Sequence, residues 1–182
     1  MSQIKLIGVA ASRAVRNIWM LKELGLAYEH EAIHYTDPAL KKPPYTDWNP
    51  NGAIPMILVD GTPLFESLAI NLFLAEKFPG ELSAKTAEER GQLAQWSLWA
   101  ATSIETDLGN WAYHTMFLPE AERRPDFAKE SLAKALKRLD VLESVLSSRP
   151  YLLGERFTVA DLNVAAVCYR ALGIDMPDKP KF

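Results

Sequence analysis

The feature of the sequence that most constrains its fold is a change in hydrophobic pattern near residues 80–86. Before this point, short apolar runs of strand length alternate with helical segments. After it, the apolar residues recur only at the spacings of three and four that are typical of helices. A chain of 182 residues is long enough to form two small units. We therefore predict a mixed α/β domain over residues 1–80 and an all-helical domain over residues 87–182.

The first unit has the predicted order β-α-β-loop-β-β-α. Asp60-Gly61 is a strong hairpin signal, because both residue types tolerate the left-handed backbone of a two-residue turn. Pro55 stands at the start of its strand, where proline is tolerated. Ser12 and Ser67 precede helical spacing and are predicted N-caps. The predicted strands cover residues 4–9, 28–35, 54–59 and 63–65, and the predicted helices cover residues 14–24 and 67–78.

The second unit is predicted to contain three helices. Thr86 is followed three residues later by Glu89, which is the pattern of a capping box, and Thr158 precedes Asp161 with the same spacing. The first helix could extend beyond Ala112. The second runs from about residue 125 through Leu146 and is ended by Pro150, and the third ends near residue 172.

Composition and charge exclude several classes of partner. The formal net charge is −3, so the chain has no basic field that would attract nucleic acid or an anionic membrane. No apolar run reaches the ~18 residues that a membrane span needs. Cys168 is the single cysteine, and no Cys/His spacing indicates a metal site. The N-terminus reads as a strand and not as a signal peptide, so the expected location is cytoplasmic.

Three segments carry a resemblance to a known family. The first is Gly8-Val9-Ala10-Ala11-Ser12 with Arg16 one turn later, the second is Asn49-Pro50-Asn51-Gly52-Ala53-Ile54-Pro55 followed by Phe65-Glu66-Ser67, and the third is Gly154-Glu155-Arg156-Phe157-Thr158-Val159-Ala160-Asp161. In position and order they resemble the cytosolic glutathione S-transferases, of a serine-type, bacterial-like branch. The resemblance implies a thioredoxin-like first domain and an all-α second domain.

The resemblance also implies a site for glutathione as co-substrate. Pro55 would be preceded by a cis peptide bond, and the backbone of Ile54 would pair with the cysteinyl backbone of glutathione. The hydroxyl and N–H of Ser67 would hold the γ-glutamyl carboxylate, and Glu66 would pair with the ammonium group. Lys41 or Lys42 would meet the glycyl carboxylate. Each of these features also has a purely structural interpretation, as a turn, a helix cap or a solvated lysine.

Ser12 is the predicted catalytic residue. The reactive thiol belongs to the substrate, and a hydroxyl that donates to the sulfur stabilises the thiolate, which is the reactive form. A helix N-terminus adds a favourable field. Gly8 and Ser12 reproduce the spacing of the serine-type branches, and Arg16 could support the site electrostatically. Alternatively, Ser12 is only a helix cap.

The helical half is expected to supply the site for a small hydrophobic electrophile. The resemblance places this site on the first helices of the second domain, where Trp99, Ser103 and Trp111 are expected to contact the electrophile. Further candidates are Thr102, Asp107, Tyr113, His114 and Phe117. Most of these side chains could equally be helix-packing residues.

The expected activity is glutathione conjugation, as in detoxification. Two alternatives stay open: a non-catalytic glutathione- or ligand-binding protein, and a glutathione-dependent peroxidase, isomerase or dehalogenase on the same fold. Resemblance alone implies a homodimer. Because most relatives carry one or two more helices after residue 177, a truncated or unusually short second domain is also expected.

Overall fold

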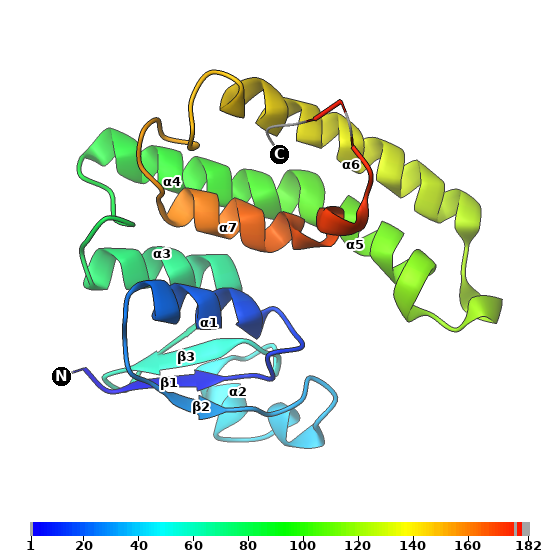
Figure 1. Ribbon diagram of the computed structural model, residues 1–182. Coiled ribbons are helices and arrows are strands. Elements are labelled where there is room, and N and C mark those ends of the chain that lie inside the picture. Colours follow the sequence, from blue (N-terminus) through cyan, green and yellow to red (C-terminus); the bar gives the residue numbers. More distant parts are fainter. Residues whose placement is uncertain (1, 177, 180–182) are drawn as a thin grey trace. The chain divides into compact units, whose positions relative to one another are not determined.

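The computed structural model describes residues 2–176 and 178–179. The chain divides into two compact units, residues 1–83 and 84–182 (Figure 1), and each unit is described by itself. None of the helices within the described residues is long and apolar enough to cross a membrane.

The first unit is built on a four-stranded mixed sheet. Its strands are β1 (Ile4–Ile7), β2 (Glu29–Glu31), β3 (Met56–Val59) and β4 (Thr62–Phe65), in the order β2-β1-β3-β4. β1 pairs parallel to β2 and antiparallel to β3, and β3 pairs antiparallel to β4. With its helices this sheet confirms the predicted β-α-β-β-β-α order of a thioredoxin-like fold.

Three of the strands are shorter than the sequence predicts. β1 ends at Ile7 and not at Val9. β2 comprises three residues, because only Glu29–Glu31 pair with β1 before the chain leaves the edge of the sheet. β3 begins at Met56 and not at Ile54, since Pro55 has no N–H to donate to a ladder.

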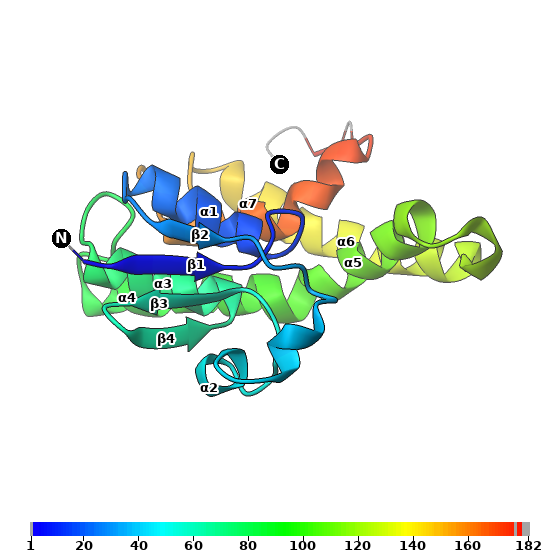
Figure 2. The same cartoon turned by 90° about the horizontal axis from the view of Figure 1, so that it is seen from below.

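Helices cover both faces of this sheet. α1 (Ala14–Glu23) and α3 (Ser67–Lys77) pack together on one face, and the short α2 (Tyr45–Trp48) lies on the other, after a 3₁₀ turn, η1 (Pro38–Lys41) (Figure 2). Under α2, a small core combines Ile7, Leu40 and Met56 with partly buried neighbours.

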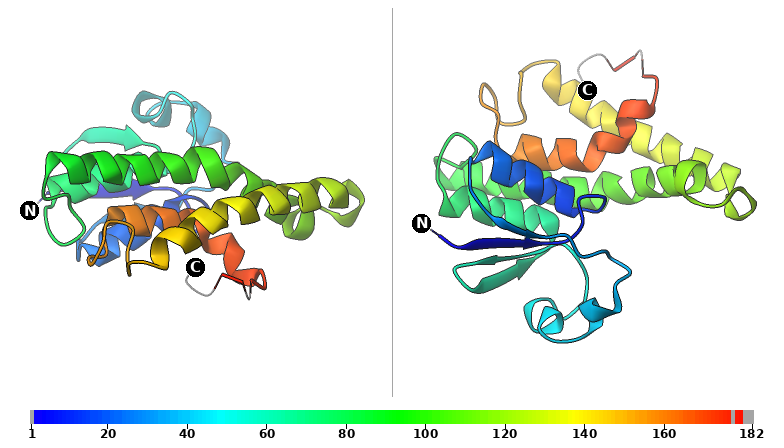
Figure 3. Two further views of the ribbon diagram at one scale, coloured as in Figure 1. Left: turned by 90° about the horizontal axis from the view of Figure 1, so that it is seen from above. Right: turned by 60° about the horizontal axis from the view of Figure 1, so that its bottom comes forward.

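The second unit is entirely helical within the part of the chain that the structure describes. Its elements are α4 (Ala87–Trp99), η2 (Ala100–Ile104), α5 (Glu105–Ala112), η3 (Tyr113–Phe117), η4 (Glu120–Glu122), α6 (Pro125–Leu146), α7 (Val159–Cys168) and η5 (Tyr169–Gly173). α7 packs against α4, and α6 packs against α5 (Figure 3). This architecture confirms the predicted all-α second half.

Two details of the helices were not predicted. The first long helix contains two π-helical turns, η2 and η3, at which it widens by one residue per turn. α6 ends at Leu146, the last apolar residue of the predicted helix, already four residues before the expected terminator Pro150; the hydroxyls of Ser147 and Ser148 donate back to carbonyl groups of the last turn.

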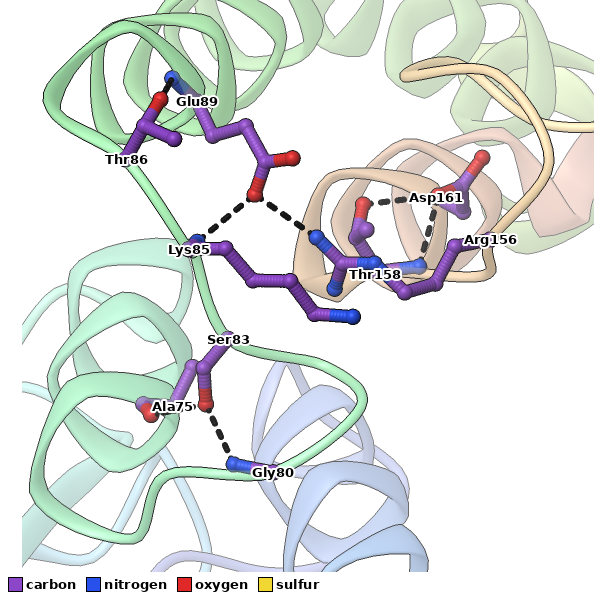
Figure 4. Close-up of polar contacts among 9 residues, drawn as sticks. All are labelled: Ala75, Gly80, Ser83, Lys85, Thr86, Glu89, Arg156, Thr158 and Asp161. Atoms are coloured by element: carbon purple, nitrogen blue, oxygen red, sulfur yellow. Dashed lines mark hydrogen bonds and ion pairs between the residues drawn. The ribbon is translucent and has the colours of Figure 1, made fainter.

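The two predicted capping boxes have different outcomes (Figure 4). At α7 the box is confirmed: the N–H of Thr158 donates to Asp161 Oδ2 over 2.8 Å. At α4, Thr86 accepts from the N–H of Glu89 over 3.2 Å, as predicted. The Glu89 carboxylate, however, accepts from the N–H of Lys85 and from Arg156, each over 2.7 Å. The predicted second bond of that box, from the N–H of Thr86 to Glu89, was therefore wrong.

Candidate functional site

The loop between β1 and α1, which carries Ser12, starts at Gly8 beside Ile54. Gly8 ends the strand with a φ of +134°, and a Cβ added to it would lie 3.1 Å from the Cβ atoms of both Ala14 and Ile54. Any larger side chain would push these segments apart. Gly8 therefore lets the loop that carries Ser12 pass close to the motif that contains Ile54.

Ser12 lies in a turn and is not the N-cap residue, which is Arg13. The prediction of an N-cap at Ser12 was therefore wrong by one position. The half-buried hydroxyl nevertheless accepts a hydrogen bond from the N–H of Ala14, the first helical residue, over 3.1 Å, and it donates to the carbonyl of Val9 over 2.7 Å. The hydroxyl is thus held at the start of α1 with its proton on the Val9 carbonyl.

Ile54 has the backbone arrangement that a peptide ligand could use. The Ile54–Pro55 peptide bond is cis, as predicted. The N–H and C=O of Ile54 have no hydrogen-bond partner among residues 2–176 and 178–179. The preceding loop is fixed by Asn49, whose amide donates to the Ala53 carbonyl over 2.7 Å and accepts from the N–H of Asn51 over 3.1 Å. This loop can therefore present the free Ile54 groups in a constant position.

The two candidate lysines differ in their surroundings. Lys41 Nζ donates to the carbonyl of Asn51 over 3.0 Å, and its chain passes Gly52 so closely that a Cβ there would lie 2.8 Å from Lys41 Cδ. The Lys42 ammonium is exposed and makes no hydrogen bond or ion pair within the described part of the chain. Of the two, Lys41 lies against the loop that precedes Ile54.

α3 starts at Ser67, which the sequence predicts to be the N-cap residue just before the helix. The N-cap is Glu66, with a φ of +69°, and Ser67 is the first helical residue, so the predicted N-cap at Ser67 was wrong. Glu66 is exposed, whereas Ser67 is buried. Arg16 donates from Nη1 to Ser67 Oγ over 3.2 Å, which links the first turn of α1 to the start of α3.

A polar network on the α2 face of the sheet was not predicted. Lys5 Nζ lies 2.7 Å from a carboxylate oxygen of Glu31, and the hydroxyl of Tyr45 donates to the same carboxylate. Burial acts to raise the pKa of Glu31, but the hydrogen bonds from Lys5 and Tyr45 outweigh it and lower that pKa. The hydrogen bond to Glu31 raises the pKa of Tyr45. This network ties α2 to the edge strand.

The three residues expected to contact the electrophile lie along one stretch of the second unit. Trp99 ends α4, Ser103 lies in the π-helical turn η2, and Trp111 lies in α5. All three are half-buried, and Trp99 packs edge-to-face on Trp96 with 5.5 Å between ring centroids. π-helical turns occur often at functional sites. The described geometry is therefore compatible with a ligand surface here.

Among the wider set of candidates, His114 has a structural explanation. Its Nδ1 accepts from the N–H of Arg124 over 3.3 Å, and its ring packs edge-to-face on Phe127 with 5.3 Å between centroids. Tyr113 and Phe117 are exposed. Cys168 is buried. Within the described residues, no cluster of three or more His, Cys, Asp or Glu side chains could hold a metal ion.

Comparison with known proteins identifies relatives of this chain. Residues 12–77 match the family described as glutathione S-transferase, N-terminal domain, and residues 108–178 match its C-terminal domain family. Glutathione S-transferase F10 of Arabidopsis thaliana is 37% identical over 153 residues, which are 81% of this chain and 71% of that protein. Glutathione S-transferase F9 of the same plant is 33% identical, over 87% of this chain and 76% of its own.

Solved structures of glutathione S-transferases are also similar to this chain. A theta class glutathione S-transferase from Xanthomonas axonopodis pv. citri, crystallised with glutathione bound, superposes with a TM-score of 0.90 and 27% identity. The match covers 100% of this chain and 89% of that one.

Proposed function

Because the chain belongs to the glutathione S-transferase family, we propose that it is a glutathione transferase of the serine type. Its reaction would join the sulfur of glutathione to a small hydrophobic electrophile, as in detoxification. The observation that carries the proposal is the close approach of Gly8, where the Ser12 loop starts, to Ile54, whose backbone N–H and C=O have no partner among the described residues.

Glutathione is proposed to lie along the first unit in an extended conformation. Its cysteinyl N–H and C=O pair with the free backbone groups of Ile54, in the manner of an added strand. The γ-glutamyl carboxylate lies at the N-terminus of α3, where Ser67 offers its N–H and hydroxyl, and Glu66 takes the ammonium group. Lys41 takes the glycyl carboxylate, since its ammonium already lies against the preceding loop.

Ser12 is proposed to stabilise the glutathione thiolate. A hydroxyl turns about its Cβ–Oγ bond, so Ser12 can exchange the Val9 carbonyl for the sulfur while Oγ keeps the hydrogen bond from Ala14. The thiol proton leaves to solvent, the thiolate forms the new S–C bond, and the leaving group departs with its electron pair. The field at the start of α1 favours the same anion.

Family membership supports three further assignments. Trp99, Ser103 and Trp111 are proposed to contact the electrophile. The functional protein is proposed to be a cytoplasmic homodimer. Size-exclusion chromatography with light scattering tests the proposed dimer, and a monomer mass at micromolar concentration would contradict it.

One observation favours a second function, that of a glutathione-binding protein without turnover. The Ser12 hydroxyl already donates to the Val9 carbonyl, a bond that the thiolate would have to replace. A protein in which this bond persists would bind glutathione without activating it.

The test combines binding with turnover. Calorimetric titration measures glutathione affinity, and conjugation of glutathione to 1-chloro-2,4-dinitrobenzene measures transfer, in wild type, Ser12→Ala and the exposed control Ser148→Ala. The proposal predicts binding in all three proteins and turnover that falls only in Ser12→Ala. Binding without turnover in wild type would support the non-catalytic function, and the absence of binding would contradict both.

A further inference from the structure

Four buried polar side chains join α1 to α3 inside the first unit. Arg16, Asn17, Ser67 and Asn71 each expose 5% of their surface or less. Asn17 Nδ2 donates to the carbonyl of Ser67 over 2.8 Å and to Asn71 Oδ1 over 2.7 Å, and Asn71 Nδ2 donates to the carbonyl of Arg16 over 3.3 Å. Hydrogen bonds among buried groups hold the partners in one arrangement. The start of α3 is thereby fixed on the first turns of α1.

Within this network, the contact between Arg16 and Ser67 has a defined direction. A guanidinium group can only donate, so the 3.2 Å contact makes Ser67 Oγ the acceptor. The hydroxyl hydrogen of Ser67 then has no acceptor among the residues that the structure describes. It is available to a ligand at the N-terminus of α3, where the partial charge of the helix favours an anion.

We propose that Arg16 is a positioning residue for the γ-glutamyl carboxylate of glutathione, and that it acts through Ser67. The inference rests on the proposed function, because it concerns the same ligand. Arg16 occupies one lone pair of the Ser67 hydroxyl and so leaves its proton to the carboxylate. It also adds a full positive charge next to the partial charge of the helix.

This role differs from simple packing in one measurable respect. A packing residue would affect every ligand of the site equally, whereas a buried cation acts on the charge of the ligand. Coulombic attraction between buried or half-buried groups is weakly screened, so the effect should depend on whether the ligand carries the carboxylate.

The test compares two ligands by calorimetric titration. One is glutathione, and the other is the analogue in which a carboxamide replaces the α-carboxylate of the γ-glutamyl residue. Arg16→Met should weaken glutathione binding about 10- to 100-fold, the range expected for a hydrogen bond to a charged group. The same substitution should change binding of the carboxamide analogue by less than about threefold, because no charge remains to be recognised.

Two further variants separate the inference from its alternatives. Lys22→Met removes the same charge from the exposed last turn of α1 and should bind both ligands as wild type does. Arg16→Lys keeps the charge but not the planar donor geometry, so it should bind glutathione with intermediate affinity. If Arg16→Met does not fold, the comparison of the two ligands is made with Arg16→Lys.

The possible results are distinct. An equal loss for both ligands in the Arg16 variants, or no loss of glutathione affinity, would overturn the role of Arg16 while the proposed function stands. A wild-type protein that does not bind glutathione would overturn both.

Discussion

Asp161 is the residue whose removal should most clearly reduce the stability of the second unit. Its carboxylate accepts three hydrogen bonds: from the N–H of Leu152 over 2.7 Å, and from the N–H and the hydroxyl of Thr158 over 2.8 Å each. Leu152, Thr158 and Asp161 are all buried. The carboxylate thus joins the loop before α7 to the first turn of that helix.

The magnitude of the loss in Asp161→Ala follows from these contacts. Loss of an N-terminal cap costs about 0.5–2 kcal/mol. Two buried N–H groups would also be left without an acceptor, at about 1–3 kcal/mol each when no water reaches them. Because the two effects overlap, we expect the free energy of unfolding to fall by about 2–5 kcal/mol. Asp161→Asn retains one carbonyl oxygen and should lose roughly half as much.

Equilibrium urea unfolding, followed by circular dichroism at 222 nm, measures this difference. Glu155→Ala removes an exposed carboxylate from the same loop and is the matched control, with an expected change below about 0.5 kcal/mol. A value for Asp161→Ala within about 0.5 kcal/mol of wild type would refute the reasoning.

Three further predictions concern the first unit. Because the pKa of Glu31 is lowered in the folded state, its contribution to folding stability is present above the ordinary carboxyl pKa and is lost as the pH falls through the lowered value. In urea unfolding between about pH 6 and pH 3, wild type should therefore lose more stability than Glu31→Gln. Equal losses in the two proteins would contradict the role of the Lys5–Glu31–Tyr45 network. Gly52→Ala should lower stability by about 1–3 kcal/mol in thermal melts, because the left-handed φ of +55° and a Cβ 2.7 Å from a backbone oxygen both oppose it, and an unchanged melting temperature would disprove this. In steady-state kinetics, Lys41→Met should raise the KM for glutathione about tenfold and Lys42→Met by less than about twofold. The reverse order would assign the contact with the glycyl carboxylate to Lys42.

The sequence was sufficient for the order of the elements and the positions of the motifs. The hairpin at Asp60-Gly61 and the apolar runs around it predicted the pairing of β3 with β4. The spacing from Gly8 to Ser12 located the loop before α1. These features are local, so residues close together in the chain carry the signal.

The remaining features depend on contacts between residues far apart in the sequence. Arg16 and Ser67 are separated by 51 positions, and only the packing of α1 on α3 brings them together. Similarly, Lys5, Glu31 and Tyr45 form a network because β1 and β2 pair in one register, which their alternation alone does not fix.

Backbone details at the helix ends also escaped prediction. The positive φ of Glu66 moves the N-cap one residue before Ser67, although serine has the higher preference for that position. The π-helical turns at Ala100–Ile104 and Tyr113–Phe117 each insert a residue without disturbing the apolar spacing enough to be recognised.

The most direct test of the account is the ultraviolet difference spectrum of bound glutathione as a function of pH, for wild type and Ser12→Ala. The thiolate absorbs where the thiol does not. If Ser12 donates to the sulfur, wild type should show a thiolate band at neutral pH, and Ser12→Ala should bind glutathione but raise the pKa of the bound thiol by about 1–2 units, as expected for the loss of one hydrogen bond to an anion. A thiolate band that is identical in both proteins, or absent from both while glutathione is bound, would contradict the assignment of Ser12.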